Sequence, residues 1–424
     1  MRKRFSIGLI TAVSFIALSV FVSLAVSATE KKKKDDLYRQ VELFSDTIAI
    51  IQSEYVDEPK AKDLIYGALK GMLSSLDPHS QFMDPDTYNE LKVDTEGRFG
   101  GVGIEITVKD GILTIVTPIE DTPAWRAGLK ANDRIVKINN DLTRDMTITD
   151  AVKKMRGKPG ETVSITVLRE SEKKVLDFKM VRDVIKIKDI KEAKILEDGI
   201  GYIRIVEFRE HTPQDISAAL ERLSKAGMKA LILDLRNNPG GLLDSAVKVA
   251  EKFIEKGKMV VYTKGRQPAQ NIEFISASAH PILDLPMIVL INDGSASGSE
   301  IVAGALQDYK RAIILGTKSF GKGSVQTVIP LSDGSALRLT TSKYFTPSGK
   351  VIHGKGVTPD IEIEAERPAA KIEDKKIEKA DDAFEEIENK DKPKDAKAFD
   401  YKADNQLMRA VDILKAARFY QTPK

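Results

Sequence analysis

Short apolar segments alternate with amphipathic ones in the second half of the chain, a pattern that predicts a mostly parallel sheet. Three segments are short and almost continuously apolar, as is typical of strands buried on both faces: 199–205, 230–236 and 287–291. Segments with apolar residues at helical spacing follow them, at 212–226, 244–254 and 297–306. Because strands alternate with helices, we expect an α/β core, which we place at residues 185–365.

A different pattern precedes this core. Residues 96–184 alternate between polar and apolar positions in short runs separated by glycine-rich turns, and they include two short helical segments. Pro123 opens the first of these helices and Gly128 closes it, because proline suits a first turn and glycine a left-handed end. We therefore expect a small separate module built mainly of short strands.

Helical segments flank these two regions. Apolar residues recur at helical spacing through much of residues 29–95, which predicts a helical spacer or dimerisation arm. Residues 366–398 form a predicted flexible linker, because 20 of the 32 residues at 366–397 are charged and cannot bury much surface. The remaining residues, 399–424, are expected to dock as a C-terminal helix.

The N-terminus predicts export. Basic residues at 2–4 precede the apolar stretch 5–26, and small residues at 26–28 resemble a cleavage site. Residues 1–28 therefore have the form of a secretory signal peptide, although the apolar stretch is nearly long enough to remain as a membrane anchor. Both interpretations place the rest of the chain in the periplasm or on the outer face of the cytoplasmic membrane.

Composition excludes several classes of partner and of catalytic site. The net charge is +3, and the three basic residues at 2–4 account for it, so the chain after residue 28 is near neutral. A general nucleic-acid-binding protein usually shows a basic stripe, and we therefore expect no nucleic-acid partner. The chain has no cysteine, which excludes thiol nucleophiles, zinc–thiolate sites and disulfides.

The clearest chemical signal is a serine in the loop N-D-G-S-A-S-G-S-E. Ser297 lies where a predicted helix begins after a buried strand, and a helix N-terminus offers free N–H groups and a positive dipole end to an oxyanion. Gly298 is the expected first donor of an oxyanion hole. A second donor is expected from N-N-P-G-G, which ends in Gly240 and Gly241, because it also follows a buried strand.

A lysine in the loop F-G-K-G-S-V-Q supplies a candidate base. A serine hydroxyl needs a base to become a good nucleophile, and the neutral amine of Lys322 can be that base. Lowering its pKa from about 10.4 to about 7.5 requires about 4 kcal/mol, which burial among small residues can supply by penalising the charged form. Gln326, four residues further on, can orient the amine without adding a negative charge.

Two other chemistries fit less well. Residues 316–322 nearly spell a phosphate-binding P-loop, but Gly323 replaces the required Ser or Thr and a strand-like segment follows. The histidines available to a Ser-His-Asp triad are His79, His211, His280 and His353. The loop does not match G-x-S-x-G, because Ala296 occupies its central position, and His353 is the histidine to mutate as a control.

These motifs together resemble those of the carboxyl-terminal processing peptidases, tail-specific serine proteases of bacterial envelopes and chloroplasts. The resemblance rests on G-S-A-S-G-S-E, F-G-K-G-S-V-Q, the upstream D-L-R-N-N-P-G-G and the downstream stretch 346–360, in the expected order, and it covers most of the mature chain. It implies a crotonase-like α/β protease core with an inserted PDZ domain, and no metal or cofactor. It also implies Ser297 as nucleophile, Lys322 as general base and Gln326 as the residue that orients the lysine. Alanine is commoner in this family at the position of Gly298, a difference that retains the backbone N–H.

Residues 97–182 similarly resemble a PDZ domain. The expected carboxylate-binding loop is Gly101, Val102, Gly103 and Ile104. Arg156 is either a gating or sensing residue by analogy with the family, or an ordinary surface arginine. The resemblance implies protein or peptide substrates with free C-termini. We further expect an activating adaptor as a candidate partner, self-association into a homo-oligomer, and membrane contact through the N-terminal segment alone. The alternative is a catalytically silent PDZ scaffold or envelope chaperone, against which the intact serine, lysine and glutamine argue.

Overall fold

The computed structural model describes residues 37–119, 121–144, 146–366 and 400–421. The predicted signal segment lies outside the described residues, as does almost all of the predicted linker. The chain divides into two compact units. The first unit ends at Asp84 and also includes Pro330–Arg338, and the second contains the remaining residues from Pro85 onward.

The first unit is mainly helical, as predicted. Its described part begins with a helix at residues 37–54, continues with α2 (Ala61–Ser74) and ends with the short strand β1 (Gln81–Met83). β1 pairs antiparallel with residues 336–338 and buries Phe82, whose ring meets that of Tyr66 edge to face. The sequence pattern did not predict this strand, because three residues are too few to show an alternation.

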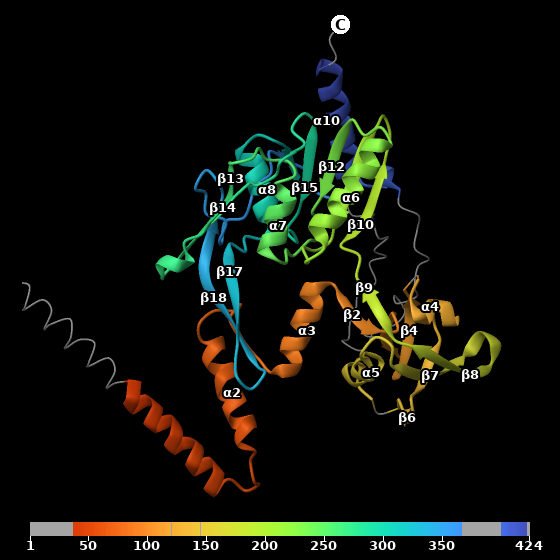
Figure 1. The fold of residues 1–424 in the computed structure, drawn as a ribbon, viewed down its shortest axis with the longest axis vertical. Helices are drawn as coiled ribbons and strands as arrows, with labels where there is room; N and C mark the ends of the chain where they lie inside the picture. Colours follow the sequence, from red (N-terminus) through yellow and green to blue (C-terminus); the bar gives the residue numbers. More distant parts are fainter. Residues whose placement is uncertain (1–36, 120, 145, 367–399, 422–424) are drawn as a thin grey trace, which may run out of the picture. The chain divides into compact units, whose positions relative to one another are not determined.

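The second unit opens with α3 (Pro85–Glu96), which leads into the expected module of short strands (Figure 1). Its sheet has the order β3 (Ile104–Lys109), β4 (Ile112–Pro118), β5 (Arg134–Ile138), β7 (Thr162–Arg169) and β8 (Lys174–Val181), with β6 (Asp141–Leu142) paired to β5. Beside it lie the paired strands β2 (Arg98–Gly101) and β9 (Asp183–Lys186), the helices α4 (Pro123–Ala127) and α5 (Ile148–Met155), and a 3-10 turn (Glu170–Glu172). As predicted, Pro123 opens α4 and Gly128 closes it at φ +87°.

The larger sheet of this unit is mostly parallel, which confirms the predicted α/β core. Its order is β10 (Ile190–Ile195), β11 (Ile200–Ile205), β12 (Ala230–Asp234), β15 (Met287–Ile291), β16 (Ile313–Gly316) and β19 (Ile361–Glu362). The β10–β11 pair is antiparallel, and the neighbours that follow are parallel. β12 and β15 are buried at every position, as their continuous apolar sequences require.

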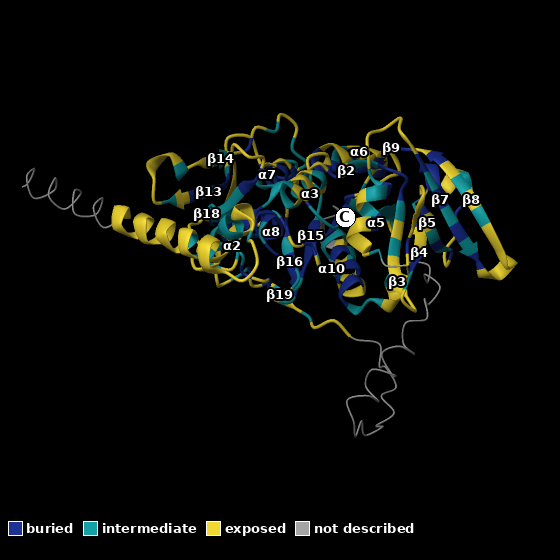
Figure 2. Cartoon of the chain, turned by 90° about the horizontal axis from the view of Figure 1, so that it is seen from below, coloured by how far each residue is buried: buried dark blue, intermediate teal, exposed yellow. Residues whose placement is uncertain are grey.

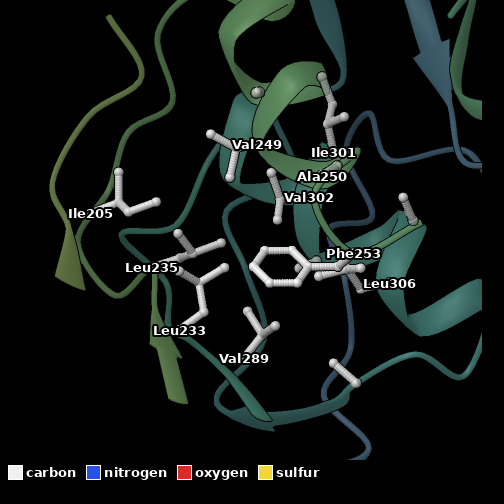
Figure 3. Packing of buried hydrophobic residues seen from close by; sticks show 14 of the residues in the cluster. Ile205, Leu233, Leu235, Val249, Ala250, Phe253, Val289, Ile301, Val302 and Leu306 are labelled. Atoms are coloured by element: carbon white, nitrogen blue, oxygen red, sulfur yellow. The ribbon is translucent and has the colours of Figure 1, made fainter. Parts of the chain in front are cut away.

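Helices cover both faces of this sheet. On one face lie α6 (Thr212–Lys225), α7 (Leu243–Ala250) and α8 (Gly298–Asp308), and on the other lies α10 (Asn405–Gln421). Figure 3 shows Phe253 in the first layer, surrounded by side chains such as Leu233 and Val289. The second layer packs Leu407 and Val411 against alternate residues of the same strands. A helix was expected to continue to Ile254, but α7 ends at Ala250.

Further strands lie beside this sheet. They are β13 (Met259–Gly265), β14 (Glu273–Ile275), β17 (Ser324–Pro330) and β18 (Ala336–Phe345), with 3-10 turns at Pro268–Gln270 and Tyr401–Ala403. β18 pairs with β13 through residues 342–345 and also pairs with β17. None of the described helices combines the length and apolar character needed to cross a bilayer.

Candidate active site

Ser297 lies in a strained turn between β15 and α8. Its backbone has φ 54° and ψ −111°, a conformation that is rare for a residue with a side chain. The neighbours of the serine are tied to another loop, because Ala296 N–H donates to the carbonyl of Asn238 and the Ser299 hydroxyl donates to the same oxygen at 2.9 Å. The strain is therefore held by hydrogen bonds from both sides of the turn.

A buried carboxylate joins this turn to the lysine loop. Glu300 has no solvent exposure, and one of its oxygens accepts the N–H groups of Ser297 and Lys322, each at 2.9 Å. Its other oxygen accepts the N–H of Gly321 and the hydroxyl of Ser319, each at 2.6 Å. The main chains of the predicted nucleophile and the predicted base therefore share one acceptor.

Burial raises the pKa of Glu300, and the four hydrogen bonds act in the opposite direction because they favour the ionised form. The burial effect is the larger, so the net pKa of Glu300 is raised. Three of the four partners are main-chain N–H groups, which can only donate, and the Ser319 hydroxyl can either donate to the carboxyl or accept from it.

The glycine loop after β12 lies directly against the serine. A Cβ atom placed on Gly240 would come within 2.7 Å of Ser297 Cβ and 2.8 Å of Gly298 N, so this approach requires a glycine. The Gly240 N–H donates to Asn238 Oδ1 at 2.9 Å and is already used. Within the described part of the chain, the N–H groups of Gly241 and Gly298 have no hydrogen-bond partner. Of the three predicted oxyanion donors, Gly240 thus has a steric role and the other two keep a free N–H.

Lys322 is half-buried, in the loop that precedes β17. Its main chain is held at both ends, because its N–H donates to Glu300 and its carbonyl accepts the hydroxyl of Tyr344. Gln326, the predicted orienting residue, lies in β17, and its Nε2 donates to Ser324 Oγ at 2.9 Å. The amide nitrogen of Gln326 is thereby engaged within its own strand.

Behind the glycine loop, an ion-pair network fixes the end of β12. Arg236 donates to both oxygens of the fully buried Asp234, at 3.0 and 2.7 Å, and to Asp404 and Gln406 at the start of α10. Tyr202 donates to Asp234 at 2.8 Å. The loop that carries the glycines is thus anchored through Arg236 to the C-terminal helix.

The strand-rich module has a small pocket at its predicted binding loop. The pocket has a volume of about 90 Å³ and is lined by Phe99, Gly101, Val102, Gly103, Ile104, Val152, Met155 and Arg156. In the part of the chain that the structure describes, the N–H groups of Val102 and Gly103 have no hydrogen-bond partner. The Arg156 guanidinium lies over the ring of Phe99, 4.6 Å from its centre. All five predicted binding residues therefore line one pocket.

Glu300 and Tyr344 were not among the predicted site residues. Glu300 had a local signal, since S-x-x-E at a helix start is the pattern of a capping box, and in the structure the Ser297 N–H donates to its side chain. No local sequence signal indicated the bonds of Glu300 to Ser319, Gly321 and Lys322, or the position of Tyr344. The exposed His353 is the histidine nearest these motifs, and a Cβ on Gly323 would come within 2.2 Å of its main-chain nitrogen.

Comparison with known proteins identifies the family. Peptidase family S41 matches residues 199–363, a PDZ domain matches residues 114–169, and the activating protease CtpB N-terminal domain matches residues 12–87. A carboxy-terminal-processing protease of Bartonella bacilliformis is 44% identical over 369 residues, which cover 85% of this chain and 84% of the relative. A probable CtpA-like serine protease of Staphylococcus aureus is 36% identical over 357 residues, which cover 84% of this chain and 70% of the relative.

A solved structure agrees at the level of fold. The putative S41 protease from Bacteroides fragilis has a TM-score of 0.50 with 17% identity, and the match covers 87% of this chain and 97% of that one. The chain belongs to the carboxy-terminal-processing proteases of peptidase family S41, and it is a serine-type peptidase with a PDZ domain. This confirms the family, the multidomain α/β fold and the enzyme class that the sequence motifs predicted.

Proposed function

We propose that this peptidase cleaves exported proteins near their C-termini with a Ser297–Lys322 dyad. The observation that carries the proposal is the Glu300 carboxylate, one oxygen of which accepts the N–H groups of both residues. A strained serine at a helix N-terminus and a lysine whose main chain bonds the same buried acceptor support this proposal, because a serine nucleophile needs a base close to it.

In the proposed reaction, Ser297 Oγ attacks the scissile carbonyl while the neutral Lys322 amine takes the serine proton. The free N–H groups of Gly298 and Gly241 support stabilisation of the resulting oxyanion, and one such donor is typically worth about 3–4 kcal/mol. The lysine ammonium then gives its proton to the leaving amine, and water hydrolyses the acyl-enzyme with the lysine again as base. Since Gln326 Nε2 donates to Ser324, its Oε1 remains to orient the lysine.

The PDZ pocket supports recognition of a free substrate C-terminus. We infer that the N–H groups of Val102 and Gly103 bind the terminal carboxylate, while the peptide adds as a strand and its last side chain enters the pocket beside Val152. Arg156 also lines this pocket, which supports a role for it in sensing the bound peptide.

The remaining proposals concern the setting of the enzyme. The N-terminal residues 1–28 support export to the periplasm or the outer face of the cytoplasmic membrane. The match to an activating protease domain supports control by an adaptor. The helix at residues 37–54 is exposed along most of its length (Figure 2). Its exposed side chains include the large apolar Tyr38 and Phe44, which supports self-association through this helix.

The test uses the full chain with Ser297→Ala and Lys322→Ala, assayed on an unfolded protein with and without candidate adaptors. Both variants should lose cleavage while keeping wild-type melting temperatures. Ser217→Ala on α6 and Lys318→Ala on an exposed turn are matched controls that should cleave normally, as should His353→Ala. Cleavage that persists in either dyad variant would show that another group attacks the substrate.

A further inference from the structure

Tyr344 connects the two residues of the proposed dyad. It lies near the end of β18, where it pairs with Thr263 of β13, and only 2% of its surface is exposed. Its N–H donates to the carbonyl of Gly323 at 3.0 Å, and its hydroxyl donates to the carbonyl of Lys322. The tyrosine is thus fixed by a strand and bonded to two successive residues of the lysine loop.

The same hydroxyl also faces the serine. The Ser297 side chain lies near enough to lower the pKa of the Tyr344 phenol by hydrogen bonding. A phenol has one proton, and here that proton is donated to the Lys322 carbonyl. Toward Ser297 the tyrosine oxygen can therefore only accept, so in a hydrogen bond between the two hydroxyls the serine is the donor.

We propose that Tyr344 is a positioning residue for the dyad, which holds the Lys322 main chain through its proton and the Ser297 hydroxyl through its lone pair. This assignment rests on the proposed function. The tyrosine sets the distance between nucleophile and base from a point outside both loops, whereas Glu300 holds only their main-chain nitrogens.

The chemistry of the phenol suits this role. Burial raises the pKa of Tyr344, the Ser297 hydrogen bond lowers it and the Glu300 charge raises it, and the net effect is a pKa well above the usual range. The phenol is therefore neutral wherever the enzyme works and does not compete with Lys322 as a base. The serine proton can pass to the lysine amine when substrate arrives, while the tyrosine proton stays on its oxygen.

Tyr344→Phe in the full chain tests the assignment, with Tyr309→Phe as the matched control. Tyr309 also donates its hydroxyl to a main-chain carbonyl, that of Met259 at 2.8 Å, on a different strand. Steady-state cleavage of a peptide with a free C-terminus gives kcat and KM, and labelling by a fluorophosphonate gives the reactivity of Ser297.

For Tyr344→Phe we expect kcat and the labelling rate to fall roughly ten- to a hundredfold, the size of effect from one or two lost hydrogen bonds, with KM little changed. The acid limb of the kcat profile should also move to higher pH, because a loosened Lys322 gains water and its pKa rises. Tyr309→Phe should change none of these. Site-specific 3-fluorotyrosine at position 344 keeps the ring and the O–H but weakens the oxygen as an acceptor, so it should give an intermediate kcat. This variant replaces Tyr344→Phe in the test if the phenylalanine variant folds poorly.

Wild-type kcat and labelling in Tyr344→Phe would overturn the assignment. So would a loss of kcat that only parallels a fall in melting temperature, with the acid limb unmoved. If Ser297→Ala and Lys322→Ala abolish cleavage while Tyr344→Phe is unaffected, the dyad stands and the tyrosine assignment fails. If either dyad variant still cleaves, both the proposed function and this inference are wrong.

Discussion

Glu300→Gln tests whether one carboxylate holds the serine turn and the lysine loop together. The two oxygens of Glu300 accept from four donors, which include the N–H groups of Ser297 and Lys322. Glutamine has nearly the same shape, but one of its terminal atoms is an NH2 donor. The Ser319 hydroxyl can turn to accept from this NH2, so in the less costly orientation the Gly321 N–H alone loses its acceptor and faces another donor.

The expected magnitude follows from these contacts. A buried donor left without a partner costs about 1–3 kcal/mol, so the stranded Gly321 N–H predicts a loss of at least that size in the free energy of unfolding. That is a large share of the roughly 5–15 kcal/mol that stabilises a typical protein. Because a misplacement of about 1 Å can cost about a hundredfold in rate, we expect cleavage to fall at least that far in the folded fraction.

Urea unfolding followed by circular dichroism measures the stability, and cleavage of an unfolded protein measures the rate. Glu221→Gln is the matched control, since Glu221 is exposed on α6 and pairs with Lys225, and it should change neither quantity much. A Glu300→Gln variant with the wild-type unfolding midpoint and the wild-type rate would refute the idea of a shared clamp.

Three further predictions follow from the site. Gly240→Ala should abolish fluorophosphonate labelling of Ser297, because the new Cβ would lie 2.7 Å from the serine Cβ; wild-type labelling would contradict that contact. Burial raises the pKa of Asp404, but its bonds to Arg236 and to main-chain N–H groups lower the pKa by more than burial raises it. The net pKa of Asp404 is therefore below its usual value. The ionised Asp404 therefore stabilises the folded state. Its contribution is fully present above the unfolded pKa of about 3.9 and is lost as pH falls through the lower folded pKa. Melting temperatures between pH 3 and 7 should therefore fall less steeply toward acid in Asp404→Asn, and parallel curves would count against the linkage. Val152→Glu should weaken binding of a C-terminal peptide at least about tenfold by like-charge repulsion, measured by fluorescence anisotropy, whereas the exposed Val175→Glu should not.

The sequence points to candidate site residues where a local signature exists. Ser297 and Lys322 stand in small-residue loops, and the PDZ loop at 101–104 follows a glycine-rich run, so each could be found without a structure. The hydrogen bonds that join the serine loop, the lysine loop and the neighbouring strands could not be predicted from local sequence. The contact of Tyr344 with Lys322 depends on how β18 passes the lysine loop, which no local pattern records.

The elements of the fold likewise divide into those that local sequence predicts and those that it does not. The buried strands were predictable because burial on both faces demands continuous apolar sequence. The end of α7 was not, because Phe253 and Ile254 keep the helical spacing of apolar residues and are buried although the helix stops at Ala250. Periodicity reports which side chains face the core, and it does not report where backbone hydrogen bonding ends. The use of the Gly240 N–H by Asn238 was hidden for a similar reason, since it depends on a side-chain rotamer.

The position of α10 has a consequence for the stability of the serine site. Leu407 and Val411 cover one face of the large sheet, and Asp404, just before the helix, bonds Arg236. Loss of α10 would bare this face of the sheet and remove a partner of Arg236, which follows β12 and precedes Gly240 and Gly241. The C-terminal helix thus links the burial of the sheet to the support of the loop beside Ser297.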